Sequence, residues 1–313
     1  MKLQQLRYLC EVANQGLNLS RAAKSLHTSQ PGISKQIQLL EEELGVDIFI
    51  RNGKRIVKIS PPGKAILKIA ERIIQDTENL KRVSQEFTHP AGGTLTIATT
   101  HTQARYVLPT VIKRFTIRYP DVRLILRQGS PTQISELVTS GEADIAIATE
   151  AIELFHELVM LPCYEWNRCV IVPPTHPLLE LKELTLEAIA QHPIITYDFA
   201  FTGRSKTNQA FESRGLTPNV VLTAIDSDVI KTYVELGLGI GILAKMAFDP
   251  KRDKHLKSIN ASHLFEPSTT RIGISRNSYL RSYIFDFIEM FAPHLTETTI
   301  RAALQKRLEH PKP

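Results

Sequence analysis

The 313-residue sequence has few cysteines and no long apolar run, and each scarcity excludes a class of protein. Its three cysteines, Cys10, Cys163 and Cys169, are too few for a disulfide framework and form no CxxC or Cys/His cluster, so we expect reduced, buried thiols and no metal site. No apolar stretch approaches the roughly 18 residues that a membrane span requires. The first twenty residues lack the apolar core and cleavage site of a secretory signal, so we expect a cytoplasmic protein with no membrane partner.

Patterns typical of enzymes are also missing. The ten histidines show neither an HExxH motif nor a readable Ser-His-Asp arrangement. The glycine-rich stretch "GLGIGIL" follows a predicted helix and precedes a predicted strand, which is the wrong order for a dinucleotide loop. His101 could serve as a base, but it is also a natural first-turn residue of a helix. We therefore expect no catalytic residue and no cofactor.

Positive charge is concentrated in the first part of the chain. Residues 1–88 hold 14 Lys and Arg against 9 Asp and Glu, whereas the remaining residues hold 24 against 23. The basic excess therefore belongs to one module, and it favours a polyanionic partner for that module alone.

Three amphipathic helices are predicted in the first 45 residues. Apolar residues recur at helical spacing from Leu3 to Ala13, and a short second helix over 19–26 has Ser20 as its candidate N-cap. The third helix lies within "TSQPGISKQIQLLEEELG", residues 28–45. Its apolar face is formed by Ile33, Ile37, Leu40 and Leu44.

The start of the third helix carries polar residues that its apolar face does not use. Thr28 or Ser29 can cap the helix, Pro31 suits its first turn, and Gly45 can end it. The remaining polar side chains project away from the apolar face, namely Gln30, Ser34, Lys35 and Gln38. A short helix followed by such a helix describes either a DNA-binding helix-turn-helix or a small helical bundle with a polar surface.

The next segment favours the DNA-binding alternative. "DIFIRNGKRIVKISPPG" predicts two short strands joined at Asn52-Gly53, a strong hairpin signal. Arg51, Lys54, Arg55 and Lys58 lie on or around its tip. A basic hairpin beside a helix-turn-helix is a winged helix, which suits DNA backbone or minor-groove contact.

Residues 1–62 resemble the DNA-binding domain of LysR-type transcriptional regulators, through "SRAAKSLHTSQPGISKQIQLLEEELGVDIFIRNGKR" and "SPPGK". This resemblance implies a regulator whose third helix reads the major groove of promoter DNA. The candidate DNA-contacting residues are Ser29, Gln30, Pro31, Ser34, Lys35, Gln38, Arg51, Lys54 and Arg55.

A long linker helix is predicted after the wing. Apolar residues at alternating a and d positions are Ile66, Ile69, Ile73, Leu80, Val83 and Phe87, with Asp76 as the one interruption. A seam of period 3.5 favours a coiled-coil dimer, although an ordinary surface helix is the alternative. "HPAGG", residues 89–93, then predicts a hinge.

The C-terminal two-thirds alternate strands with helices. Apolar strands such as "TLTIATT", "VRLILRQ" and "ADIAIAT" are followed by a second series with "RCVIVPP", "PIITYD", "NVVLTA" and "GIGILA". This pattern predicts parallel sheets covered by helices, in two Rossmann-like subdomains as in periplasmic binding proteins. The chain would cross between them near 162–167 and return near 266–271.

Hydroxyl and amide side chains gather where the predicted strands end. Thr99 to Gln103 follow the first strand, Ser130 and Thr132 the second and Thr149 the third, while Thr202 precedes a helix of the other series. Each threonine alone could be a simple N-cap. Together with helix N-termini, these neutral donors predict a cleft that holds a small anion.

The C-terminal region resembles the CysB branch of the LysR family, through "TTHTQARYVLP", "QGSPTQISELV", "ADIAIATEA", "FTGRS" and "DSDVIKTYVELGLGIGILA". That branch governs sulfur assimilation, cysteine synthesis or sulfonate use. The resemblance implies that the anion is sulfate, O-acetylserine, N-acetylserine or adenosine phosphosulfate. It assigns anion contacts to Thr100, Thr102, Gln103, Thr149 and Thr202, with Ser130 and Trp166 as further candidates. Trp166 could equally be a core residue where the subdomains join.

We therefore expect a winged helix-turn-helix domain (1–61), a coiled-coil linker helix (62–88), a hinge (89–93), an α/β effector-binding domain (94–295) and a tail with a surface helix (296–313). Subdomain I would span about 94–163 and 268–295, and subdomain II about 164–267. A solute-binding protein would explain the C-terminal region equally well, but not the basic winged helix. The resemblance implies a homo-oligomer, a tetramer built as a dimer of dimers, with RNA polymerase as a further candidate partner.

Overall fold

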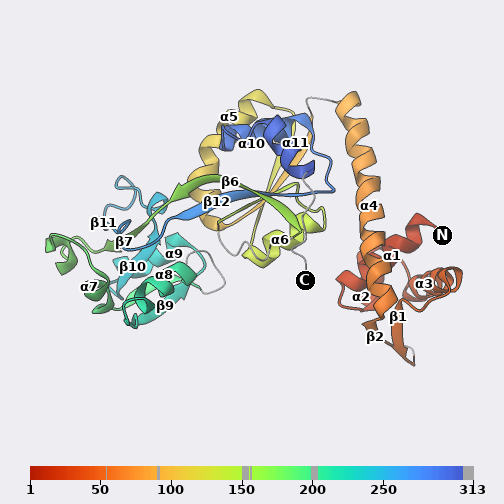
Figure 1. Ribbon diagram of the computed structural model, residues 1–313, viewed down its shortest axis with the longest axis horizontal. Helices are drawn as coiled ribbons and strands as arrows, with labels where there is room; N and C mark the ends of the chain where they lie inside the picture. The colour runs from red at the N-terminus through yellow and green to blue at the C-terminus, as the bar shows by residue number, and fades with distance from the viewer. Residues whose placement is uncertain (54, 90–91, 150–154, 156, 199–203, 306–313) are drawn as a thin grey trace. The chain divides into compact units, whose positions relative to one another are not determined.

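The computed structural model of the protein describes residues 1–53, 55–89, 92–149, 155, 157–198 and 204–305. It divides into two compact units (Figure 1), Met1–Gln85 with Asn277–Tyr279, and Glu86–Arg276 with Leu280–Pro313. No helix in the described part of the chain is long and apolar enough to cross a membrane.

The first unit is a helix-turn-helix with an antiparallel hairpin and a long helix. Its elements are α1 (Leu3–Asn14), α2 (Leu19–Ser25), α3 (Gln30–Leu44), β1 (Phe49–Asn52), β2 (Arg55–Ile59) and α4 (Pro61–Thr88). The predicted hairpin is confirmed, because Asn52 pairs with Arg55 and Gly53 has a left-handed backbone with φ of 59°.

The ends of α3 form as the sequence predicts. Ser29 caps its start by accepting a hydrogen bond from the Gly32 N–H, and Gly45 ends it in the left-handed conformation. The predicted cap of α2 is wrong, since the Asn18 side chain, rather than Ser20, accepts the first free N–H groups. Leu44, which the sequence pattern places on the apolar face, is exposed. Glu41 is buried on that face instead.

The linker helix α4 has apolar residues both against the core of the first unit and in solvent. Ile66 and Ile73 of the predicted seam pack against the apolar core of the helix-turn-helix, so this part of the coiled-coil prediction is wrong. The core ends before the helix does. Large apolar side chains of α4 also lie in the open: Ile69, which falls between the two packed isoleucines in sequence, is 60% exposed, and Leu80 and Phe87, beyond the core, are 71% and 82% exposed.

The second unit contains two mixed five-stranded sheets. The first has the order β4-β3-β5-β12-β6. The elements of this subdomain are β3 (Gly93–Thr99), the π-helical turn η1 (Gln103–Val107), α5 (Leu108–Arg118), β4 (Val122–Gln128), α6 (Pro131–Thr139), β5 (Ile145–Ala148), β6 (Leu158–Trp166), β12 (Ser268–Ser275), α10 (Ser282–Phe291) and α11 (Glu297–Gln305).

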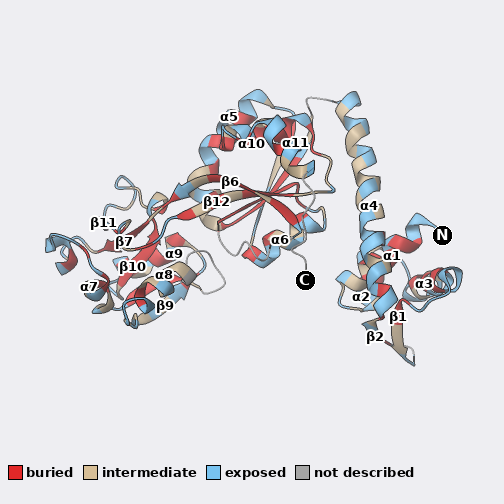
Figure 2. Ribbon diagram, in the orientation of Figure 1, coloured by how far each residue is buried: buried red, intermediate tan, exposed pale blue. Residues whose placement is uncertain are grey.

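The second sheet has the order β11-β7-β10-β8-β9. Its subdomain is built from β7 (Arg168–Val172), η3 (Pro177–Glu180), α7 (Leu186–Ala190), β8 (Ile194–Tyr197), α8 (Arg204–Glu212), β9 (Val220–Ala224), α9 (Ser227–Glu235), β10 (Ile240–Ala244), η4 (Lys245–Ala247) and β11 (Lys257–Asn260). In Figure 2 the inner strands of both sheets are red, which marks them as buried.

The prediction of purely parallel sheets is wrong at one side of each sheet. β3 runs parallel to β4 and β5, and β8 runs parallel to β9 and β10, as expected. In contrast, β6, β7, β11 and β12 pair antiparallel with their neighbours. A single residue, Asn167, separates β6 from β7, so the chain passes directly from the first sheet into the second.

The end of the chain and the hinge also differ from expectation. α11 is more than a surface helix, because Ile300 is fully buried in the core of the first subdomain. The Arg301 guanidinium lies over the Phe285 ring, 4.6 Å from its centre. Of the predicted hinge, Gly93 is the first residue of β3, and residues 90–91 lie outside the described chain.

Close packing at the start of α4 gives a stability prediction. A Cβ on Gly63 would lie 2.1 Å from the Ile48 carbonyl oxygen, which is backbone and has no freedom to rotate away. We expect Gly63→Ala to lower the free energy of unfolding of the first unit by about 1–3 kcal/mol, measured by thermal unfolding with circular dichroism. Lys64→Ala, at the next and exposed position, is the control. An unchanged midpoint for Gly63→Ala would contradict this packing.

Candidate functional site

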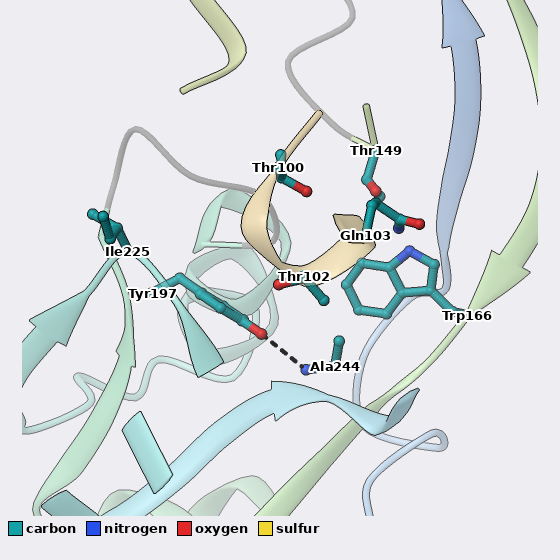
Figure 3. A pocket seen from close by; sticks show the side chains of 8 residues that line it. All are labelled: Thr100, Thr102, Gln103, Thr149, Trp166, Tyr197, Ile225 and Ala244. Carbon is teal, nitrogen blue, oxygen red and sulfur yellow. Dashed lines mark hydrogen bonds between the residues drawn. The ribbon is translucent and has the colours of Figure 1, made fainter. Parts of the chain in front are cut away.

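A pocket lies where strands of both sheets end, within the second unit (Figure 3). Its empty volume is about 340 Å³, which includes space open to solvent. Its lining residues are Thr100, Thr102, Gln103, Thr149, Trp166, Tyr197, Ile225 and Ala244.

The first subdomain supplies a wall of fixed polar groups. Gln103 is buried, and its amide donates to Thr270 Oγ1 at 3.1 Å while its carbonyl oxygen accepts from the Tyr164 hydroxyl at 2.6 Å. Thr149 lies 3.3 Å from the same Thr270 oxygen, hydroxyl to hydroxyl. These bonds hold the side chains in one arrangement, so this wall is organised by contacts within the protein.

The second subdomain supplies Tyr197, Ile225 and Ala244, which the sequence prediction missed. The buried Tyr197 hydroxyl lies 2.6 Å from Ser227 Oγ, accepts from the Ala244 N–H at 3.4 Å and is hydrogen-bonded to Thr102. Burial raises the pKa of Tyr197, so the phenol stays protonated. All three residues end or follow strands that the sequence predicts. Their position at strand ends is therefore the feature of the sequence that could have identified them as pocket residues.

Trp166 stands at the junction of the two subdomains. It is the last residue of β6, and the Arg168 guanidinium lies 5.3 Å from its ring centre. Its indole N–H is buried and has no hydrogen-bond partner within the described structure, although it lines the pocket. Trp166 is therefore both a residue of the junction and a candidate donor to a ligand.

Among the described residues that line the pocket, no side chain is formally charged. Hydroxyls, an amide and an indole N–H surround it, and Thr100, Thr102 and Gln103 lie where the helical segment after β3 begins. The first N–H groups of a helix have no intrahelical partner and carry the positive end of its dipole. Such a site can hold an anion by hydrogen bonds without a counter-ion.

The structure brings five of the seven predicted effector residues together. Thr100, Thr102, Gln103, Thr149 and Trp166 all line the pocket. Ser130 does not. It caps α6 in a capping box with Gln133, so its hydroxyl has a local structural task. Thr202 lies outside the described residues.

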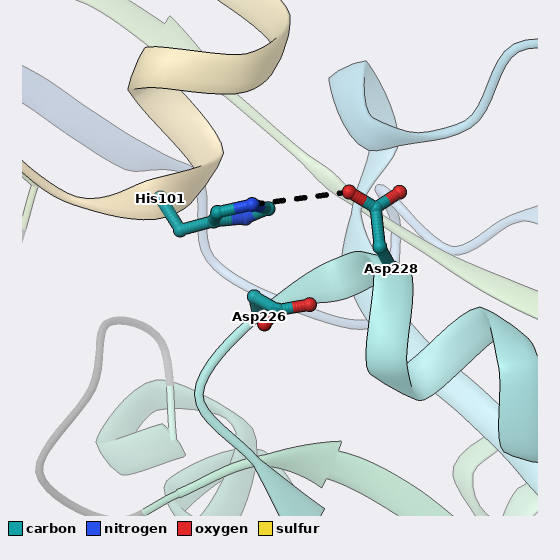
Figure 4. A group of neighbouring side chains, drawn as sticks. All are labelled: His101, Asp226 and Asp228. Atoms are coloured by element: carbon teal, nitrogen blue, oxygen red, sulfur yellow. Dashed lines mark ion pairs between the residues drawn. The ribbon is translucent and has the colours of Figure 1, made fainter. Parts of the chain in front are cut away.

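A charged cluster lies beside the pocket (Figure 4). The ligand atoms of His101, Asp226 and Asp228 all lie within 4.8 Å of one another, a spacing that a metal ion could bridge. Asp226 already caps α9, and Asp228 lies 3.4 Å from Arg105 and 3.3 Å from Lys231. Because these two cations would repel a metal ion, we interpret the cluster as an ion-pair network.

The start of α3 presents the predicted DNA-contacting side chains to solvent. Four are exposed and Ser34 is half-buried, while the Ser29 hydroxyl caps the helix at 3.2 Å from the Gly32 nitrogen. The exposed residues are Gln30, Pro31, Lys35 and Gln38. Together they form one polar surface on the first unit that its own core does not use.

The basic residues of the wing differ in their surroundings. Arg55 is exposed, whereas the Arg51 guanidinium lies 2.7 Å from the Glu41 carboxylate. Glu41 is buried and also accepts from the N–H groups of Ile48 and Phe49, at 2.8 and 3.0 Å. Arg51 thus has a structural partner that the sequence prediction did not foresee. Lys54 lies outside the described residues.

Two family models match the chain. Residues 3–64 match the "Bacterial regulatory helix-turn-helix protein, lysR family" model, and residues 88–296 match the "LysR substrate binding domain" model. The first match lies in the first unit, and the second spans most of the second unit.

Close relatives match almost the whole chain. The chain is 54% identical over 306 residues to the transcriptional regulator SsuR of Burkholderia cenocepacia, covering 98% of this chain and 99% of that protein. It is 54% identical over 307 residues to the regulator CysB of Haemophilus influenzae, covering 98% and 95%. A crystal structure of the cofactor-binding domain of the Cbl transcriptional regulator is 45% identical, with a TM-score of 0.66, and covers 69% of this chain and 95% of that one.

Proposed function

The chain belongs to the LysR family of transcriptional regulators, and from this premise we propose that it controls sulfur-assimilation genes in response to a small anion. It is a DNA-binding regulator and not an enzyme. The observation that carries the effector proposal is the pocket, whose described lining residues offer neutral hydrogen-bond donors and acceptors from two subdomains. The identity with SsuR and CysB over nearly the whole chain supports the sulfur branch.

We propose that the first unit binds promoter DNA with α3 in the major groove and the wing on the backbone. The exposed Gln30 and Gln38 amides match the N6 and N7 groups of adenine, and Lys35 can reach guanine. Arg55 lies on the hairpin, where it would meet phosphate. We place this activity in the cytoplasm, with RNA polymerase as a further partner.

Two substitutions separate base reading from phosphate contact. Arg55→Ala should weaken binding to specific and random DNA alike and reduce the slope of log affinity against log salt by about 1, because one phosphate contact is lost. Gln30→Ala should cut the preference for the target over random DNA by about 1–3 kcal/mol. Fluorescence anisotropy at several salt concentrations measures both.

Arg51→Ala is the matched control for Arg55→Ala. Because Arg51 pairs with the buried Glu41, its loss should lower the melting temperature of the first unit, and Arg55→Ala should not. Equal loss of specific and random binding in Gln30→Ala would contradict the base-reading role.

The ligand assignment is tested by calorimetric titration of the full chain with sulfate, O-acetylserine, N-acetylserine and adenosine phosphosulfate. We expect saturable binding of one of them, weakened roughly 10–100-fold by Thr102→Ala, which removes a hydrogen bond to a charged ligand. Thr132→Ala is the control, because Thr132 is exposed on α6 and does not line the pocket. If none of the four binds, the assignment to sulfur metabolism is contradicted, whereas the assignment as a DNA-binding regulator is unaffected.

We propose that the exposed apolar residues of α4 bind a second copy of the chain. In a single chain, three large apolar side chains of this helix are exposed to water, those of Ile69, Leu80 and Phe87. A homodimer formed through α4 would cover them. Dimers of such dimers would give the tetramer that the family resemblance implies.

A single charge on this surface tests the dimer. Leu80→Glu should reduce the mass measured by sedimentation equilibrium, since it would bury an unpaired carboxylate in the interface. Lys81→Glu, at the adjacent exposed position, should keep the wild-type mass. Wild-type mass for Leu80→Glu would place the dimer contact elsewhere.

A further inference from the structure

One side chain of the first subdomain reaches into the second. Tyr106 lies on η1, which follows β3 of the first sheet, yet its ring packs against the apolar core between the second sheet and α9. Its hydroxyl donates to Asp228 Oδ1 on α9 at 2.6 Å. This hydrogen bond therefore joins the two subdomains directly.

Cations surround the acceptor of this bond. Arg105 Nε of the first subdomain lies 3.4 Å from the Asp228 carboxylate, and Lys231 Nζ of the second lies 3.3 Å from it. Lys231 is buried, and its ammonium also pairs with Asp253 at 3.1 Å and lies 5.0 Å from the Tyr106 ring centre. The contact between the subdomains is thus polar, directional and partly shielded from solvent.

Both partners keep the protonation states that the bond needs. Burial and the hydrogen bond to Asp228 raise the pKa of the Tyr106 phenol far above its ordinary value, so the phenol remains a donor. Burial alone would raise the pKa of Asp228, but the Tyr106 hydroxyl and the Lys231 ammonium hold it below its ordinary value. Asp228 therefore stays ionised as the acceptor.

The same short turn also forms a wall of the pocket. Gln103 lies three residues before Tyr106 in η1, and it is fixed to Thr270 and Tyr164 in the first subdomain. A π-helical turn is an uncommon conformation that is frequent at functional sites. Here it connects a pocket-lining residue at one end with the inter-subdomain bond at the other.

We propose that Tyr106 and Asp228 form a clasp that sets the closure of the two subdomains and thereby the affinity for the effector. The proposal rests on the proposed function, in which one ligand contacts both pocket walls. Such a ligand binds fully only to the clasped arrangement. The apparent affinity then scales with the fraction of molecules that are clasped.

The test uses the full chain and removes only the hydroxyl. Tyr106→Phe keeps the ring packing, and Tyr233→Phe is the matched control. Tyr233 is also partly buried against the same core, from α9, and its hydroxyl has no hydrogen bond among the described residues. The chain has one tryptophan, Trp166, at the junction of the subdomains, so its emission spectrum reports their closure.

We expect Tyr106→Phe to shift the emission of the unliganded protein to longer wavelength, because an open junction exposes the indole to water. With saturating ligand, Tyr106→Phe and wild type should have the same spectrum. Titration with sulfate and with N-acetylserine should show affinity about tenfold lower than in wild type for whichever probe binds, the loss of a hydrogen bond to a charged group. Tyr233→Phe should match wild type in both measurements.

A conservative pair separates the clasp from general destabilisation. Asp228→Asn keeps an acceptor for Tyr106, so it should lose less affinity than Asp228→Ala. Equal affinity of Tyr106→Phe and Tyr233→Phe, or an unchanged emission spectrum, would overturn the clasp. If wild type binds none of the four candidate ligands, the sulfur proposal fails on its own. The spectrum of the unliganded variant then decides the clasp, a shift supporting it and no shift overturning it.

Discussion

The antiparallel pairing of β6 with β12 is the constraint on which the effector-binding unit depends. The pairing begins where Trp166 faces Ser268, at the point where both strands leave the first subdomain. Arg168 holds this crossing by donating to the Glu266 carbonyl oxygen and to Ser268 Oγ, both at 3.0 Å. Because the two crossing segments are tied together, the subdomains face each other with the ends of their parallel strands turned toward one pocket.

The chemistry of the pocket follows from that geometry. Strand ends and helix starts leave backbone N–H groups and short hydroxyl side chains at the same place, and these groups complement an anion. A buried arginine or lysine in the lining would need desolvation and a counter-ion before any ligand arrived. Charge instead lies beside the pocket, where Asp228 is paired with Arg105, Lys231 and Tyr106. The described side chains that line the pocket are thus neutral, whereas charged groups join the two subdomains beside it.

The DNA-binding unit follows the same division of tasks. Glu41 on α3 accepts two backbone N–H groups at the start of β1 and pairs with Arg51 at its end, so one buried carboxylate fixes the wing to the helix beside it. The exposed polar residues at the start of α3 make no contribution to that core. The unit therefore positions its polar surface with internal contacts and keeps the surface itself free for DNA.

Local patterns in the sequence determined the helix-turn-helix, the hairpin at Asn52-Gly53, the alternation of strands and helices, and four of the pocket residues at strand ends. These features depend on spacing, caps and turns within a few residues, which a sequence displays directly. Only the tertiary structure decided the antiparallel crossing, the pairing of Arg51 with Glu41, the burial of Ile300 and the joining of Tyr106 to Asp228. Each joins residues that lie on different elements, and their contact is set by packing, because no local pattern specifies which elements meet.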